Sequence, residues 1–97
     1  MNNQRWYDKE PTLSLAVSLL QNSELNVRHK CADLAIEIAM KNGVVLPNDI
    51  KSAVEYLMRR WYDKDEILAQ AMEYIKNSDE ELRKKIAISM IDFLQNV

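Results

Sequence analysis

The sequence predicts an all-α protein in which residues 1–97 form a single domain of five helices, two tandem antiparallel αα-hairpins joined by a connecting helix. Three observations lead to this prediction. The chain of 97 residues contains one glycine and two prolines, far fewer than average, which favours helix over turn-rich folds. Apolar residues recur at helical spacing along most of the chain. Finally, the pentapeptide Arg-Trp-Tyr-Asp-Lys occurs twice, at residues 5–9 and 60–64.

The recurring pentapeptide begins a longer internal duplication. Residues 5–40 and 60–95 align without a gap and are identical at about a third of the positions, which is well above chance and indicates a repeat. We therefore divide the chain into a first repeat (5–42), a connector (43–59) and a second repeat (60–97). We expect the recurring polar and aromatic residues to be structural; they are Arg5, Trp6, Tyr7, Asp8, Arg28, Arg60, Trp61, Tyr62, Asp63 and Arg83.

Each repeat is predicted to contain two helices. The first helices span about 9–21 and 64–76, with Asp8 and Asp63 as N-caps, and Tyr62 is expected to pack on Ile67 as a hydrophobic staple. Both helices reach an Asn-Ser pair, whose serine is expected to cap the second helix, over 24–42 or 79–95. A connection this short predicts that the helices of a repeat lie antiparallel. Gly43 is expected in a left-handed conformation after the first repeat, before a helix that ends near Arg59.

Arg28 and Arg83 fall on the apolar side of the second helices. A charge inside a packing face needs a partner, because an unpaired buried charge is costly. Candidate partners are the Asp8 and Asp63 carboxylates, the side chains of Asn22 and Asn77, and the carbonyl end of a neighbouring helix. We interpret both arginines as structural clamps, with anion binding as the alternative.

The second helices resemble those of HEAT-type repeats. Val27-Arg28 followed by Ala32, Ala35 and Ile38, and Leu82-Arg83 followed by Ala87, Met90 and Phe93, are similar to the apolar-Arg pair that opens the second helix in that family. The resemblance implies a helical scaffold that binds partners along its surface and has no catalytic residues. The sequence departs from the family pattern at Asn22 and Asn77, where an Asp is expected, and in its longer period of 55 residues.

Motifs for catalysis, cofactor binding or metal binding are missing from the sequence. His29 and Cys31 are the only residues of their kinds, and their spacing completes no metal-ligand pattern. One glycine cannot form a glycine-rich phosphate loop. Nucleophilic catalysis would need a base near Ser or Cys, and His29 is expected to face solvent. We therefore expect no enzyme activity, no catalytic residues, no cofactor and no metal.

The expected function is protein interaction. Leu15, Ile36 and Ile88 lie off the centres of their apolar stripes, so we expect them to form an interface, most simply with a second copy of the chain. The alternative is a small nucleic-acid-associated regulator that would use Arg59, Arg60, Lys84 and Lys85. The net charge of −2 disfavours that alternative. A single cysteine, no N-terminal apolar segment and no apolar run of about 20 residues predict a bacterial-type cytoplasm and no membrane partner.

Overall fold

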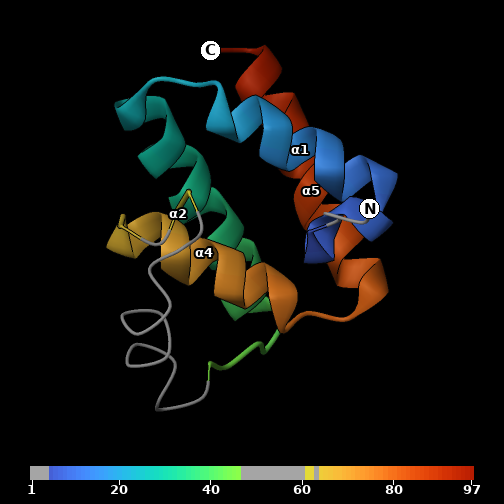
Figure 1. Cartoon of the computed structure of the whole chain (residues 1–97). Helices are drawn as coiled ribbons and strands as arrows, with labels where there is room; N and C mark the ends of the chain where they lie inside the picture. The colour runs from blue at the N-terminus through green and yellow to red at the C-terminus, as the bar shows by residue number, and fades with distance from the viewer. Residues whose placement is uncertain (1–4, 47–60, 63) are drawn as a thin grey trace.

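The computed structural model describes residues 5–46, 61–62 and 64–97, and the regular secondary structure among these residues is all helical, with no strand. The predicted all-α class is thus confirmed. Figure 1 shows the arrangement of the elements, which are the 3₁₀ turn η1 (Trp6–Lys9) and the helices α1 (Pro11–Gln21), α2 (Leu25–Lys41), α4 (Glu66–Lys76) and α5 (Glu80–Gln95). The predicted connecting helix, from Asn48 or Asp49 to about Arg59, lies outside the described residues.

The helix ends follow the repeat closely. Each of the four α-helices in the described residues stops at an asparagine whose side-chain Nδ2 donates to the carbonyl four residues earlier; these are Asn22, Asn42, Asn77 and Asn96. The serines that follow two of them act in the same way, since Ser23 Oγ donates to the Leu19 carbonyl and Ser78 Oγ to that of Tyr74, both at 2.8 Å. The predicted serine caps are therefore wrong, because these hydroxyls complete the preceding helix.

The helix starts also lie later than predicted. Asp8 belongs to η1, and the N-cap of α1 is Glu10, which makes no side-chain cap bond; Pro11 takes the first position, where its missing N–H is tolerated. Asp65 caps α4 by accepting from the Leu68 N–H at 3.2 Å. Asp63, the predicted cap, lies outside the described residues. The predicted staple placed Tyr62 directly before an Asp63 cap; because Asp65 is the cap of α4, Tyr62 does not hold that position.

Gly43 ends the first repeat as predicted. Its φ of +84° is in the left-handed region. The Gly43 N–H donates to the Met40 carbonyl and the Val44 N–H to that of Ala39, each at 3.0 Å, which is a Schellman motif. Glycine suits this position because it has no Cβ to disfavour a positive φ.

The helices pack between repeats more than within them. α1 lies mainly against α5, α2 lies mainly against α4, and α2 also contacts α5. By contrast α1 and α2 touch little, and so do α4 and α5 (Figure 1). The predicted packing of each repeat as an antiparallel hairpin is therefore not confirmed. A short connection fixes where two helix ends meet, but each helix turns away to bury its apolar face against the other repeat.

One core is shared by both repeats. Tyr7, Leu13 and Leu20 of the first repeat and Tyr62, Leu68 of the second are all at most 1% exposed. The two second helices contribute side chains of different size to it. Those of α2 are mostly small (Cys31, Ala32, Ala35, Ala39), and those of α5 are larger (Ile86, Ala87, Met90).

Candidate functional site

The two copies of the pentapeptide meet and exchange hydrogen bonds. Trp6 Nε1 donates to the hydroxyl of Tyr62 at 3.3 Å, and Trp61 Nε1 donates to the hydroxyl of Tyr7 at 3.4 Å. Within each copy the Trp and Tyr rings pack edge to face, with centroids 5.4 Å apart. Each tyrosine thus lies in the shared core while its hydroxyl satisfies the indole of the other repeat, as buried aromatic polar groups require. The contact is reciprocal, like that of a two-fold symmetric dimer.

Both clamp arginines have partners of the expected kind. Arg28 donates to the carbonyls of Ser23 at 2.9 Å and Gln21 at 2.6 Å, and its guanidinium lies 5.8 Å from the ring centroid of Trp61. Arg83 donates to the carbonyl of Ser78, the residue equivalent to Ser23. Each arginine therefore ties the start of a second helix to the end of the helix before it. The side chains of Asn22 and Asn77 are not partners, because they bond to their own helices.

Two further polar contacts join the repeats at equivalent places. Arg83 Nε donates to a carboxylate oxygen of Glu10 at 2.7 Å, and each side chain is 23% exposed. In the other repeat His29 Nε2 lies 2.6 Å from a carboxylate oxygen of Asp65. Glu10 and Asp65 are 55 positions apart and both precede a first helix, so the two acids are repeat counterparts.

Sequence reasoning missed these contacts between the repeats. It placed His29 in solvent, whereas the imidazole is 35% exposed and bonded to Asp65. The retained acid at positions 10 and 65 was the available signal, because a carboxylate kept next to each first helix indicates a recurring partner. The basic partner differs: Arg83 pairs with Glu10, but His29, the neighbour of Arg28, pairs with Asp65.

The pKa values of Asp8, Asp65 and Cys31 are shifted, each for a clear physical reason. Hydrogen bonds from the side chain and backbone N–H of Arg5 lower the pKa of Asp8, and Ser14 Oγ adds another. Burial acts to raise the pKa of Asp65, but hydrogen bonds from His29 and the Leu68 N–H outweigh it, so that the pKa is lowered. Burial raises the pKa of the Cys31 thiol to about 12, so this cysteine is a core residue rather than a reactive one.

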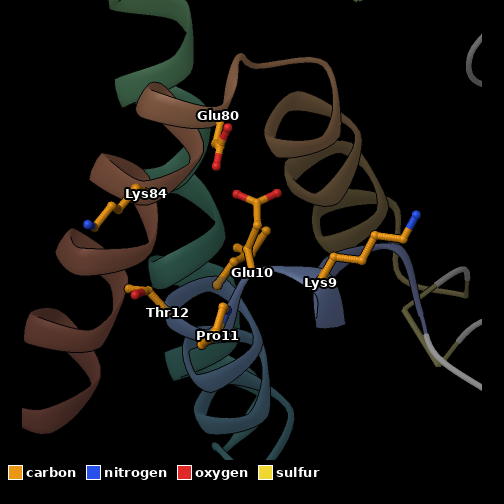
Figure 2. Close-up of a pocket in the computed structure, with 7 residues that line it drawn as sticks. Lys9, Glu10, Pro11, Thr12, Glu80 and Lys84 are labelled. Carbon is orange, nitrogen blue, oxygen red and sulfur yellow. The ribbon is translucent and has the colours of Figure 1, made fainter.

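A small cavity of about 200 Å³ opens where α1 and α5 begin. Lys9, Glu10, Pro11, Thr12, Leu13, Glu80 and Lys84 line it. In Figure 2 the carboxylates of Glu10 and Glu80 point toward one another across this cavity, whereas Lys9 and Lys84 extend away from it. The described residues include no group of three or more His, Cys, Asp or Glu side chains that could hold a metal ion.

The residues expected at an interface are in different environments. Leu15 of α1 is 51% exposed and Ile88 of α5 is 53% exposed, and these two helices pack together. Ile36 instead packs partly buried against the core, so it does not belong with them. The positions equivalent to Leu15 and Ile88 are Gln70 and Asp33, both exposed and polar. Leu15 and Ile88 are therefore exposed apolar residues whose counterparts in the other repeat are polar.

The residues expected to contact nucleic acid are only partly described. Lys84 and Lys85 are exposed on α5, and Lys84 borders the cavity that holds Glu10 and Glu80. Arg59 and Arg60 lie outside the described residues. Glu80 lies one helical turn before Lys84 on α5 and adds a negative charge to the same region, which weakens the attraction of this region for a phosphate backbone.

Comparison with known proteins gives no relative. No protein-family model matches this chain, and neither curated proteins nor solved structures include a match. Among the helices that the structure describes, none has the length and apolar character needed to cross a bilayer.

Proposed function

We propose that this chain is a non-enzymatic protein-interaction module, a small helical scaffold that associates with a second copy of itself. The observation that supports this most is the exposure of Leu15 and Ile88 on the paired helices α1 and α5. Exposed apolar side chains cost free energy in water unless a partner covers them. Because the equivalent positions of the other repeat are the polar residues Gln70 and Asp33, folding alone does not explain them.

The HEAT-like resemblance and the cytoplasmic location are parts of the same proposal. Interleaved packing of the repeats differs from a stack of separate hairpins. The resemblance is therefore limited to the second helix with its arginine. A lone buried thiol, Cys31, suits a reducing compartment.

The repeat itself supplies the test. Leu15→Gln with Ile88→Asp gives each position the residue of its counterpart, so the fold should tolerate both changes. We expect sedimentation velocity over a concentration series to show a dimer for the original chain and a monomer for this variant, with the same helical circular dichroism. Met40→Gln is the matched control, because Met40 is 59% exposed at the end of α2 and its counterpart is Gln95. A chain that stays monomeric at all concentrations would refute the proposal.

Nucleic-acid regulation is the competing proposal, and it requires Lys84 and Lys85 to bind phosphates. Binding to mixed DNA and RNA over a salt series separates the two, since phosphate contacts weaken steeply with added salt. Lys84→Gln with Lys85→Gln should lower the affinity and the salt dependence if this alternative holds. We expect no salt-dependent binding.

A further inference from the structure

Each repeat depends on the other to cover its apolar face. The helices of one repeat make few contacts with each other, whereas α1 packs on α5 and α2 on α4. Leu13, Leu20, Leu68 and Ile75 are nonetheless at most 1% exposed. A separated repeat would therefore expose most of its apolar face to water, and covering that face again would strongly favour association.

The contacts between repeats have the form of a dimer interface. The indole of each repeat donates to the tyrosine hydroxyl of the other, and a basic residue of each second helix contacts the acid before the first helix of the other repeat. In such an isologous contact, the same surface on both sides supplies both partners. None of these contacts requires the two repeats to belong to the same chain.

The core specifies that a first repeat pairs with a second. α2 and α5 contact each other, and the buried residues of α2 are mostly small whereas those of α5 are larger. At equivalent positions Cys31 corresponds to Ile86 and Ala35 to Met90. Two first repeats would leave unfilled space between their alanines, and two second repeats would crowd their large side chains; both faults are destabilising. A first repeat paired with a second repeat combines the small buried side chains of α2 with the larger ones of α5.

We propose that a second copy of this chain can supply either repeat, so that two chains form a closed dimer by exchanging repeats reciprocally. The first repeat of each chain packs on the second repeat of the other and remakes the Trp–Tyr, Arg83–Glu10 and His29–Asp65 contacts. Each first repeat accepts one second repeat, and in a reciprocal exchange between two chains every repeat has its partner. This inference rests on the proposed self-association and specifies how it occurs.

Crosslinking of the full chain can show which chain supplies each repeat. Thr12 of α1 and Lys84 of α5 line the same cavity but belong to different repeats (Figure 2). In the variant Thr12→Cys/Lys84→Cys, a short bismaleimide joins the repeats that are packed together. Buried Cys31, with its raised pKa, should not react in the folded protein. The chain is unfolded in guanidinium, refolded at increasing protein concentration, crosslinked, and quenched with excess thiol before denaturing electrophoresis.

The expected result is a covalent dimer whose share rises with the refolding concentration. The control Lys9→Cys/Thr12→Cys has both cysteines in the first repeat at the same cavity, so it should give covalent monomer at every concentration. Covalent monomer alone from Thr12→Cys/Lys84→Cys, over the whole concentration range, would overturn the exchange.

Sedimentation of the same samples distinguishes the two proposals. A dimer by sedimentation with only intrachain links would overturn the exchange but keep self-association through Leu15 and Ile88. A dimer with interchain links that persists in the Leu15→Gln/Ile88→Asp background would support the exchange and refute the role of those two residues. A monomer under every condition would overturn both.

Discussion

Replacing Arg83 by methionine tests how strongly the polar contacts between the repeats stabilise the fold. Arg83 donates to the Ser78 carbonyl and to the Glu10 carboxylate, and its side chain is 23% exposed. The carbonyl bond contributes about 1 kcal/mol, and the partly exposed ion pair about 1 kcal/mol. Because methionine keeps the apolar stem but neither bond, we expect Arg83→Met to lower the free energy of unfolding by roughly 2 kcal/mol.

Arg28→Met provides the comparison. This substitution removes two hydrogen bonds to backbone carbonyls and a contact with the Trp61 ring, so we expect it to lower the free energy of unfolding by a similar amount, roughly 2 kcal/mol. Glu10→Gln should couple to Arg83→Met by about 1 kcal/mol in a double-mutant cycle, and to Arg28→Met by less than about 0.5 kcal/mol. Urea unfolding followed by circular dichroism measures these values, because guanidinium chloride would screen the ion pair. Changes within error for both arginines, with helicity kept, would refute the clamp interpretation.

Three other substitutions test single features. Tyr7→Phe and Tyr62→Phe should each lower the free energy of unfolding in urea by about 1 kcal/mol, since each leaves one indole N–H unsatisfied. A loss of stability in only one of the two variants would contradict equivalent Trp–Tyr hydrogen bonds in the two repeats. The pKa of Asp65 is lowered in the fold, so its stabilisation is complete above the unfolded value of about 3.9 and is lost as the pH falls through the lower folded value; Asp65→Asn should remove this acid-dependent part of the unfolding free energy, and an unchanged pH profile would contradict it. Gly43→Ala should cost about 1 kcal/mol in thermal unfolding, because alanine disfavours a positive φ; a neutral result would exclude that reason.

The helices could be predicted from sequence because their signals are local. Low glycine and proline content, apolar spacing and the two Asn-Ser pairs located all four helices that the structure describes, and Gly43 marked the end of the first repeat. The starts were less certain, because adjacent residues can serve equally well as caps. Asp79 rather than Ser78 caps α5, accepting from the Leu82 N–H at 2.8 Å. Where the chain enters the helix decides between such neighbours, and that depends on tertiary packing.

The packing of the helices could not be predicted in the same way. An apolar stripe shows which face of a helix is buried, but it does not identify the helix that covers it. The short Asn22–Glu24 connection suggested that α1 and α2 cover each other. In the structure α5 covers α1, and α4 covers α2. For the same reason His29 was placed in solvent, because its partner Asp65 belongs to the other repeat. Contacts between the repeats can be predicted only after it is known which helices of the two repeats pack together.

Reciprocal packing explains why some repeated residues match and others differ. Trp6 donates a hydrogen bond to Tyr62, and Tyr7 accepts one from Trp61. A substitution in one copy of the pentapeptide therefore removes a hydrogen bond from the other copy. The buried residues of α2 and α5 do not match in this way. At equivalent positions Cys31 corresponds to Ile86 and Ala35 to Met90, so the two helices fill the shared core with side chains of different size.

The exposed residues neither exchange hydrogen bonds between the repeats nor fill the core. Leu15 and Ile88 can therefore be compared with their counterparts as surface residues. Leu15 and Gln70 hold equivalent surface positions, as do Ile88 and Asp33, and all four are exposed. Neither the exchange of hydrogen bonds nor the fit of the core requires an apolar residue there. Leu25, Met40 and Ile67 are exposed apolar residues as well, so the comparison of Leu15→Gln/Ile88→Asp with the Met40→Gln control decides whether Leu15 and Ile88 in particular bind a partner.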